Sequence, residues 1–381
     1  MPQFKRYTED QIRNNLNEGR ALIIYGSRRT GKTTICRNIL QDYGKEGRYL
    51  NCENFLDRGL IENPNIDTVI NLLREYKVVV IDEAQTIPRI GFILKLIYDT
   101  MQERSIDTQI IATGSSSFDL ANKIGEPLVG RAFWRTMYSL SIAEISEEFD
   151  DLQLQSKLEG ILRFGLMPDI FNSSEDKAIA KLNELVSAYL YKDILAVEGI
   201  QKSSLVENIL KALAHQVGST VSIRELAQIV SSTPATVEKY LNILENCFVI
   251  FSLGSLSRNP RNEIKKNKKY YFWDIGVRNA IIQNFNKIED RNDIGAIWEN
   301  FCIVERIKYM SKINQSCNRY FWRSLAQQEI DYIEEYGGKL VTWECKYSPK
   351  KQVKTPTEFT KTYTDYEFKV INSENWLENL K

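Results

Sequence analysis

The chain has almost no histidine and no excess of either charge. His215 is the single histidine among 381 residues, so catalytic triads that need histidine and zinc sites built from several histidines are excluded. Fifty Lys and Arg side chains balance fifty Asp and Glu side chains. The net charge therefore gives no overall attraction to nucleic acid or to a membrane surface, and either partner would have to be met by a local patch.

Paired cysteines and long apolar runs are missing as well. The six cysteines are scattered without a C-x-x-C pair, which predicts reduced thiols in a cytosolic protein. No apolar run is long enough to span a membrane, and the stretch from Met1 to Arg6 has no signal-peptide core. We therefore expect a cytoplasmic protein with no membrane partner. A chain of this length predicts two or three domains.

A glycine-rich loop between an apolar run and a helical pattern is the most informative motif. This phosphate loop follows the pattern G-x-x-x-x-G-K-[ST] and adds one threonine: Gly26, Ser27, Arg28, Arg29, Thr30, Gly31, Lys32, Thr33 and Thr34. The glycines let backbone N–H groups point inward as an anion nest, at the start of a helix whose dipole favours phosphate. Lys32 is expected to reach the β- and γ-phosphates of a nucleotide, and the Thr33 hydroxyl to ligate Mg²⁺. The alternative is a chance glycine turn.

A second apolar run ends in two carboxylates. Residues 77–82 are expected to form a strand buried on both faces, which carries Asp82 to its carboxyl end. Asp82 is then placed to support Mg²⁺, and Glu83 to activate the attacking water as a general base. Together the two motifs predict that the chain binds ATP with Mg²⁺ and hydrolyses it. Taken alone, an apolar run ending in Asp-Glu also fits a strand that enters a solvated turn.

The first 148 residues alternate between strand and helix patterns. Strands are predicted at residues 21–25, 48–53, 77–82, 107–113 and 132–140, with helices between them. Such alternation predicts an α/β domain with a doubly wound parallel sheet that binds its ligand at the carboxyl ends of the strands.

Further side chains are candidates for the hydrolytic step. Thr113 and Ser115 follow the fourth predicted strand and are placed to orient the lytic water or to sense the γ-phosphate; a serine-rich helix cap is the alternative. Arg131 could supply positive charge to the transition state, in its own chain or in a neighbouring subunit, and Arg135 is a second candidate. A surface role is the alternative for both arginines. An arginine that acts on the nucleotide of a neighbouring subunit would belong to a homo-oligomer, which is compatible with this sequence.

The middle of the chain is predicted to contain a helical segment followed by a winged helix. Residues 149–202 are predicted to form a helical lid on the nucleotide domain. Residues 203–275 predict a winged helix, with helices at a tight turn and a hairpin behind them. The recognition helix is poor in basic residues, whereas the wing, residues 258–269, carries six basic side chains. We expect the wing to contact DNA phosphates; a solvated hairpin or a protein-docking module is the alternative.

The last predicted domain, residues 276–381, contains a candidate Mg²⁺ site. A hairpin is predicted to turn at a Gly-Gly pair, with Asp331 before the turn and Glu344 and Lys346 after it. Because side chains alternate across a strand, Glu344 and Lys346 share one face, which Asp331 joins. With Glu299 from a neighbouring helix they form an oxygen-rich site, with Asp331 and Glu344 as the metal ligands. Alternating charges on an exposed strand are the alternative.

Both halves of the chain resemble known families. The segments GSRRTGKTT, VVVIDEAQ, ATGSSS and GRAFW resemble AAA-type P-loop ATPases, and YLYKDIL is similar to the linker of one prokaryotic group of these ATPases. The second half looks like that group's partner region, a domain of uncharacterised function with a winged helix and an α/β PD-(D/E)XK nuclease-like fold. The resemblance implies that the nuclease motif falls on Glu299, Asp331, Glu344 and Lys346. Residues 165–168 depart from the group, which usually has a second glycine and an aromatic residue there.

The sequence thus predicts an Mg²⁺-dependent ATPase that acts on DNA, with a nuclease-like site that would cut a phosphodiester. Its rival is an ATP-driven conformational switch that binds a protein partner and retains the nuclease-like fold as a scaffold. Charge neutrality and the poorly basic recognition helix favour the rival, whereas the lysines of the wing and the intact carboxylate set favour the first interpretation.

Overall fold

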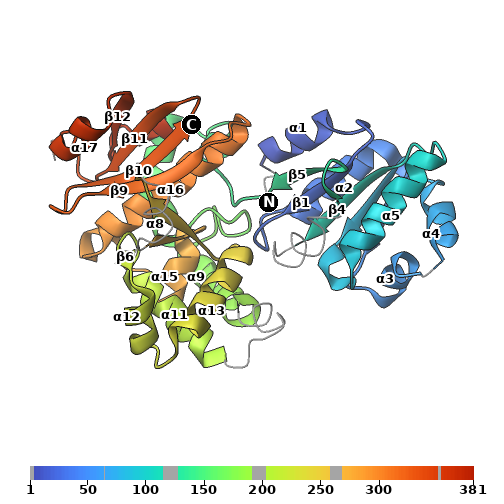
Figure 1. The fold of residues 1–381 in the computed structure, drawn as a ribbon, viewed down its shortest axis with the longest axis horizontal. Helices are drawn as coiled ribbons and strands as arrows, with labels where there is room; N and C mark the ends of the chain where they lie inside the picture. Colours follow the sequence, from blue (N-terminus) through green and yellow to red (C-terminus); the bar gives the residue numbers. More distant parts are fainter. Residues whose placement is uncertain (1–3, 64, 115–127, 191–202, 258–267, 351–352) are drawn as a thin grey trace. The chain divides into compact units, whose positions relative to one another are not determined.

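The chain divides into two compact units, which we treat separately (Figure 1). The computed structural model describes all residues except 1–3, 64, 115–127, 191–202, 258–267 and 351–352. The first unit comprises Met1–Ser139 and Asn246–Phe248, and the second comprises Leu140–Glu245 and Val249–Lys381. None of the described helices combines the length and the apolar composition that a membrane crossing requires.

The first unit is built on a parallel sheet whose described strands lie in the order β2-β3-β4-β1-β5. The strands are β1 (Ala21–Tyr25), β2 (Gly47–Asn51), β3 (Val78–Asp82), β4 (Gln109–Gly114) and β5 (Ala132–Thr136). Every residue of β3 and β4 is buried, as expected for continuous apolar runs in a sheet covered on both faces. All pairings are parallel, so the carboxyl ends of these strands share one edge. The predicted doubly wound sheet is confirmed.

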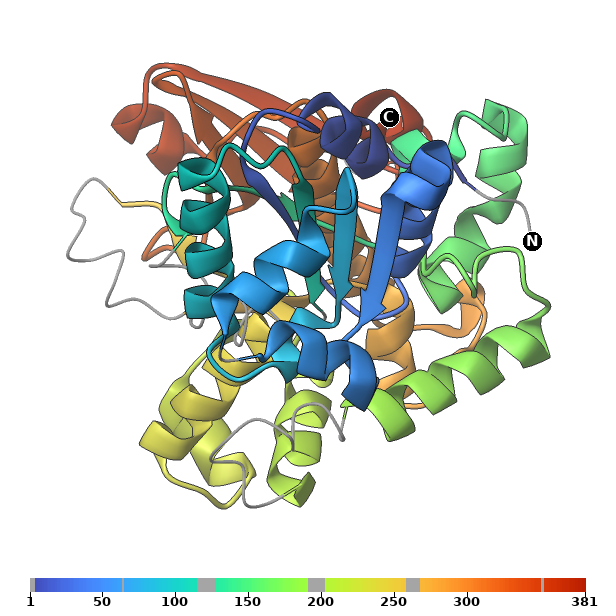
Figure 2. The same ribbon diagram turned by 90° about the vertical axis from the view of Figure 1, so that its right-hand side faces the viewer.

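Helices cover both faces of this sheet (Figures 1 and 2). The helices are α1 (Tyr7–Asn14), α2 (Lys32–Tyr43), α3 (Phe55–Ile61), α4 (Ile66–Leu73) and α5 (Ile90–Glu103), with 3₁₀ turns η1 (Gly44–Glu46) and η2 (Ala84–Thr86). Side chains alternate along β1: Leu22 and Ile24 pack with α1 and α2, whereas Ile23 packs with α3, α4 and α5. The alternation of one strand thus divides the core into two layers.

The second unit contains a mixed sheet in the order β12-β11-β10-β9-β7-β8-β6 among its described strands. The strands are β6 (Thr220–Val221), β7 (Ile250–Ser255), β8 (Lys268–Phe272), β9 (Asn318–Arg323), β10 (Glu329–Tyr336), β11 (Lys339–Cys345) and β12 (Tyr366–Ile371). The predicted hairpin turn is confirmed, since β10 and β11 pair antiparallel across Gly337 and Gly338. Because β7 pairs with β9, one sheet runs across the predicted domain boundary at residue 275.

The helices of the second unit account for the segment that we expected to be a lid. They are α7 (Ile142–Ile145), α8 (Asp151–Phe164), α9 (Glu175–Glu184), α11 (Ser203–His215), α12 (Ile223–Ile229), α13 (Pro234–Asn246), α15 (Ile275–Ile281), α16 (Ile294–Lys312), α17 (Thr357–Thr362) and α18 (Trp376–Leu380), with η4 (Leu185–Leu190) and η5 (Ile288–Asp290). Asn279 of α15 donates to the carbonyl oxygens of Leu162 and Arg163 at the end of α8, both at 3.0 Å. The described part of residues 149–202 therefore belongs to the second unit, and its role as a lid stays a prediction. Residues 191–202 lie outside the described residues.

Candidate nucleotide-binding site and acidic cluster

The phosphate loop connects β1 to α2, and its glycines have backbone conformations that other residues rarely adopt. Gly26 has a φ of +143° and Gly31 a φ of +99°. A Cβ atom on Gly26 would lie 2.1 Å from the carbonyl oxygen of Met137, so no side chain fits there. Met137 follows β5 and donates its backbone N–H to the carbonyl oxygen of Tyr25 at 2.7 Å. The shape of the loop therefore depends on the strand beside it as well as on its own glycines.

Lys32 begins α2, and its ammonium group turns back into the loop. Nζ donates to the carbonyl oxygens of Gly26 and Ser27 at 2.9 and 2.8 Å. Burial lowers the pKa of Lys32 to about 8, although the nearby carboxylates of Glu83 and Asp82 act in the opposite direction. The group is thus a buried cation at neutral pH, held at the position where the loop's N–H groups and helix dipole favour phosphate.

The other loop side chains differ in exposure. Thr30 is buried, and its hydroxyl donates to the carbonyl oxygen of Ser27 at 2.7 Å. Arg28 is half-buried, whereas Arg29 and Thr34 are exposed. Arg29 also has a left-handed backbone, with a φ of +56°. The Thr30 side chain therefore fixes the loop from within.

Two segments outside the motif also hold the loop. Arg6, just before α1, donates to the carbonyl oxygens of Thr30 at 2.6 Å and of Tyr138 at 2.8 Å. The Ser27 hydroxyl donates to the carbonyl oxygen of Phe248 at 2.8 Å, in the short stretch after α13 that belongs to the first unit. No sequence motif pointed to Arg6 or Phe248, because both are distant from the phosphate loop along the chain.

Asp82 lies at the carboxyl end of β3 and accepts hydrogen bonds from three hydroxyl groups. Thr33 of the phosphate loop donates to Oδ2 at 2.9 Å, Tyr49 of β2 donates to the same oxygen, and Thr113 of β4 donates to Oδ1. Thr33 Oγ1 and the Asp82 carboxylate are oxygen donors of the kind that Mg²⁺ prefers, so these residues fit the metal that the motif implies. The structure thus joins the phosphate loop to the acidic strand.

Glu83 follows Asp82 in a left-handed conformation, with a φ of +53°. Its backbone N–H donates to the hydroxyl of Thr113 at 3.2 Å, and its carboxylate accepts a hydrogen bond from the side chain of Gln85. Thr113 therefore contacts both residues of the Asp-Glu pair, which places this predicted side chain in the candidate site. Ser115, its predicted companion, lies outside the described residues.

The structure does not bring Arg131 to the phosphate loop of its own chain. Its carbonyl oxygen accepts the N–H of Ala21 at 2.9 Å, at the amino edge of the sheet, whereas the loop lies at the carboxyl edge. Its Nε forms an ion pair with Asp99 of α5 at 2.7 Å. Arg135 of β5 donates to the side-chain oxygen of Asn15 at 2.6 Å. Arg131 thus lies away from the phosphate loop of its own chain, and its action on the transition state stays a prediction.

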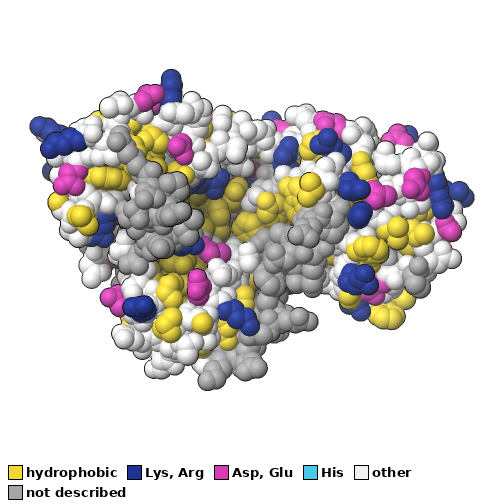
Figure 3. Space-filling model, in the orientation of Figure 1, with side chains coloured by type: hydrophobic (Ala, Val, Ile, Leu, Met, Phe, Trp, Pro, Cys, Tyr) yellow, Lys and Arg dark blue, Asp and Glu magenta, His cyan; other side chains and the backbone are white. Residues whose placement is uncertain are grey.

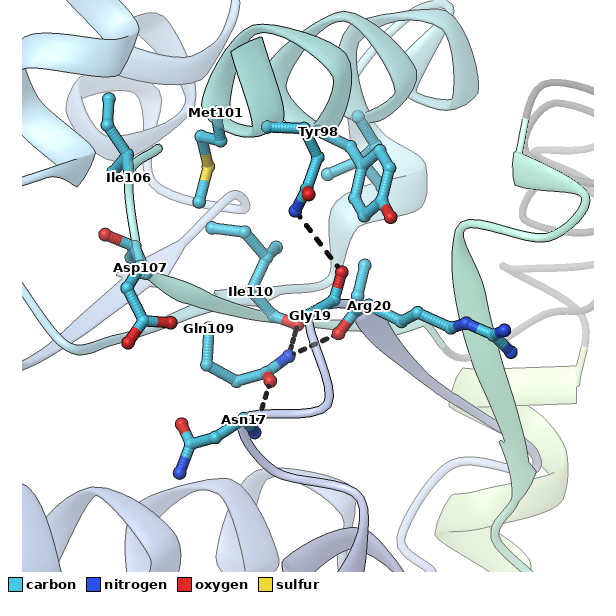
Figure 4. A pocket seen from close by; sticks show the side chains of 13 residues that line it. Asn17, Gly19, Arg20, Tyr98, Met101, Ile106, Asp107, Gln109 and Ile110 are labelled. Carbon is cyan, nitrogen blue, oxygen red and sulfur yellow. Dashed lines mark hydrogen bonds between the residues drawn. The ribbon is translucent and has the colours of Figure 1, made fainter. Parts of the chain in front are cut away.

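A small pocket lies at the amino edge of the same sheet (Figure 4). Gln109, the first residue of β4, donates to the carbonyl oxygen of Arg20 at 2.8 Å and accepts the N–H of Asn17 at 2.9 Å. The pocket has a volume of about 40 Å³, which holds a few water molecules. It is therefore too small for a nucleotide and lies away from the phosphate loop.

The second unit brings together the residues of the predicted nuclease motif. Lys346 Nζ lies 2.6 Å from Oε1 of Glu344 and 3.3 Å from Oδ2 of Asp331. The same Asp331 oxygen accepts the backbone N–H of Cys345 at 2.8 Å. Burial, and then the charge of Asp331, raise the pKa of Glu299 in α16 and the pKa of Glu344. Glu299 therefore lies close enough to Asp331 to interact with its charge. The hairpin geometry expected from the sequence is what assembles this group.

Lys269 lies among these carboxylates, although we expected it on an exposed wing. Its side chain is 2% exposed, and Nζ lies 3.0 Å from Oε1 of Glu299 and forms a second ion pair with Glu329. The hydroxyl of Tyr271 donates to the same Glu299 oxygen at 2.6 Å. The prediction that Lys269 contacts DNA from the wing is therefore wrong, because β8 begins at Lys268 and its residues from Lys269 onward are buried. Residues 258–267 of the wing lie outside the described residues.

The four carboxylates of the second unit, which we call the acidic cluster, do not have the form of a metal site. The acidic cluster consists of Glu299, Glu329, Asp331 and Glu344. Within the part of the chain that the structure describes, no group of three or more His, Cys, Asp or Glu side chains is arranged to hold a metal ion. The predicted Mg²⁺ ligands of this unit therefore do not fit the metal in the arrangement seen, in which Lys346 pairs with Asp331 and Glu344, and Lys269 pairs with Glu299 and Glu329.

Comparison with protein families assigns the first unit. Residues 18–146 match the family described as an AAA domain (AAA_14). This match spans the phosphate loop and the strands β1 to β5, and it supports an AAA-type P-loop domain in the first unit. Residues 155–288 match a domain of unknown function (DUF8612), and residues 294–377 match another (DUF4143).

Curated relatives extend over most of the chain. The Mycobacterium tuberculosis protein Rv2008c is 24% identical over 346 residues, which cover 90% of this chain and 74% of that protein. A Haemophilus influenzae protein is 25% identical over 280 residues, which cover 68% of each chain. Both relatives are described as uncharacterized.

Solved structures resemble the chain only distantly. AMPPCP-bound DnaA from Aquifex aeolicus is 18% identical, with a TM-score of 0.31, and the match covers 64% of this chain and 89% of that one. A RuvB variant from Thermotoga maritima is 14% identical, with a TM-score of 0.34, and the match covers 68% and 91%.

Proposed function

We propose that the AAA-type domain binds ATP with Mg²⁺ and hydrolyses it. The observation that carries the proposal is a connected set of contacts at the carboxyl edge of the sheet. Thr33, next to Lys32 in the phosphate loop, donates to Asp82, and Thr113 bonds to both Asp82 and Glu83. These contacts join the residues for phosphate, metal and water activation into one site.

Each residue has a distinct role in this proposal. Lys32 and the loop N–H groups bind the phosphates, and Lys32 is mostly protonated near neutral pH because its pKa is lowered only to about 8. Thr33 and Asp82 hold Mg²⁺, which when bound supplies positive charge to the phosphate oxygens. Glu83 accepts a proton from the attacking water as a general base. The hydrogen bond from Gln85 orients the Glu83 carboxylate.

Replacing Glu83 by Gln tests the proposed base. Glu83→Gln should bind ATP within about twofold of the wild-type affinity but hydrolyse it about 10²–10⁴-fold more slowly, because the amide cannot accept the proton. Fluorescent-nucleotide titration and phosphate release measure the two quantities. Glu103→Gln, an exposed residue at the end of α5, is the matched control and should change neither. A wild-type turnover in Glu83→Gln would remove Glu83 from this role.

We further propose that the second unit acts on DNA. Support comes from the order of its central elements, α11-β6-α12-α13-β7-β8, in which β8 pairs antiparallel with both β6 and β7. This is the order of a winged helix, with α13 as the recognition helix. The surface of α13 gives less support, since the exposed Lys239 is next to the exposed Glu238.

The second candidate is an ATP-driven switch that binds a protein partner. The burial of Lys269 favours it, because this removes one basic side chain from the proposed DNA surface. On the faces visible in Figure 3, basic and acidic side chains are interspersed, as the balanced composition leads one to expect. Exposed apolar side chains on α3 and α5, such as Phe55 at 74% and Phe92 at 50%, are typical of a protein contact, which a homo-oligomer would also use.

DNA binding and solution mass separate these candidates. Binding of labelled single- and double-stranded DNA should weaken steeply between about 50 and 200 mM salt if basic side chains contact phosphates. No retention at the lower salt would leave the protein-binding switch. A molar mass that rises with ATP would support a homo-oligomer, and loss of turnover in Arg131→Ala would then support its action across subunits.

A further inference from the structure

Lys269 is the feature of the second unit that the predicted nuclease motif does not explain. It comes from β8, far from the motif along the chain, and it is more deeply buried than Lys346, the lysine of the motif. The Lys269 side chain is 2% exposed and that of Lys346 is 30% exposed. A buried ammonium group needs carboxylate partners to offset its loss of hydration, and Lys269 has two.

The contacts of Lys269 use an oxygen that a metal ion would need. Oε1 of Glu299 accepts from both the Lys269 ammonium group at 3.0 Å and the Tyr271 hydroxyl at 2.6 Å. The other oxygen of Glu299 faces Gly218, where a Cβ atom would lie only 3.0 Å from it. Two protein donors therefore already occupy the Oε1 atom of Glu299, whose side chain is 13% exposed.

One carboxylate oxygen of the acidic cluster has no such partner. Oε2 of Glu344 is buried without a hydrogen bond, and the residue is 7% exposed. Its other oxygen is held by Lys346. A buried carboxylate oxygen without a donor is unfavourable, and a cation is the ligand that would satisfy it.

Charge explains why the ammonium group and a divalent cation exclude each other. Both would occupy the space between Glu299 and the β10 carboxylates, where Lys269 is attracted by Glu299, Glu329 and Asp331. A divalent ion placed there would repel the lysine at short range and leave it buried without compensation. Lys269 is tethered to the site by its own strand, so it competes without any entropy of association.

We propose that Lys269 is a built-in counter-cation that closes the acidic cluster to divalent metal ions, and that removing its charge opens a site for Mg²⁺ or Mn²⁺ on Glu299, Asp331 and Glu344. In the wild-type unit the carboxylates then pair with Lys269 and Lys346 rather than with a metal ion. This inference is independent of nucleotide hydrolysis in the first unit.

Manganese binding to the full-length chain without nucleotide tests the inference. Free Mn²⁺ is measured by electron paramagnetic resonance during titration of wild type, Lys269→Met and Lys339→Met. Lys269→Met should bind one further Mn²⁺ at least about tenfold more tightly than wild type, because a cation is removed from among the carboxylates. Lys339→Met removes an exposed lysine from the start of β11 and should titrate like wild type. Adding Asp331→Asn to Lys269→Met should abolish the gain and so assign it to the acidic cluster.

A charge-balanced variant covers the case in which Lys269→Met does not fold. Lys269→Met combined with Glu329→Gln removes one ion pair as a whole and keeps the three proposed metal ligands. Circular dichroism confirms folding before each titration. The inference is overturned if the wild type already binds Mn²⁺ in an Asp331-dependent manner. It is equally overturned if the folded double variant binds no more Mn²⁺ than wild type.

Discussion

The Asp82 carboxylate is positioned by hydrogen bonds from hydroxyl groups of three different segments. The strand order places β2 and β4 on either side of β3, so Tyr49 and Thr113 reach the carboxylate from both neighbours. Burial, and then the hydrogen bond to Asp82, raise the pKa of Tyr49, which keeps its hydroxyl a donor. The motif predicted Asp82 and Thr33, but Tyr49 could not be predicted, because nothing along the chain shows which strand lies beside β3.

The buried state of Lys32 predicts that ATP binding depends on pH. In the free protein its pKa is about 8, and a bound triphosphate favours the charged form and raises that pKa. Binding therefore takes up a proton above about pH 8, so affinity should fall by up to about tenfold per pH unit as the pH rises toward about 9.5. Nucleotide titrations across this range measure the slope. Lys77→Met, at an exposed lysine of the same unit, should keep the slope, whereas an equally steep slope in Lys32→Met would contradict the assignment.

At the scale of elements, a buried ion pair fixes α16 on the sheet of the second unit. Arg306 of α16 donates to both carboxylate oxygens of Glu334 in β10, at 3.0 and 2.8 Å. The Glu334 side chain is fully buried and that of Arg306 is 8% exposed. Because α16 also carries Glu299 and β10 carries Asp331, this pair sets the spacing of the acidic cluster.

Breaking this pair from one side should destabilise the second unit strongly. Arg306→Leu leaves the Glu334 carboxylate buried without its partner, at a cost of about 3–5 kcal/mol in the free energy of unfolding. Urea unfolding followed by circular dichroism measures this change. Arg306→Leu combined with Glu334→Leu should recover most of the loss. Arg224→Leu, at an exposed arginine of α12, should stay within about 0.5 kcal/mol of wild type. A loss below about 1 kcal/mol in Arg306→Leu would contradict the role of the pair.

The residue at which β8 begins determines whether Lys269 is buried or exposed. We expected a strand from about residue 270, with the lysines before it in an exposed wing. The strand instead begins at Lys268, and its pairing with β7 places Lys269 opposite Leu253. A shift of two residues in the start of the strand brings a charged side chain into a strand whose residues from Lys269 to Phe272 are all buried. Hydrophobic periodicity could not predict the burial of Lys269, because a charged side chain counts as polar in such a pattern.

For the whole molecule, two units with separate cores predict two unfolding transitions. Each unit has its own sheet, and a domain with its own core unfolds cooperatively. Mg²⁺-ATP at about a hundred times its Kd should raise the Tm of one transition by roughly 5–10 °C and leave the other unchanged. Differential scanning calorimetry measures both. Lys32→Ala should abolish the shift, and equal shifts of both transitions would show that the units do not unfold separately.

The sequence by itself determined the candidate nucleotide site of this protein, and the tertiary structure decided how the carboxylates of the acidic cluster are paired. The phosphate loop and Asp82 could be read directly because their chemistry needs particular residues at fixed spacing along one strand–loop–helix segment. Asp331 and Glu344 could be named from the hairpin and its alternation, and Glu299 from the neighbouring helix, whereas Glu329 was not predicted. Whether they hold a metal or a lysine depends on β8, which joins the same sheet from 30 residues before Glu299. Contacts between segments so far apart are set by packing and strand order, and no local pattern encodes them.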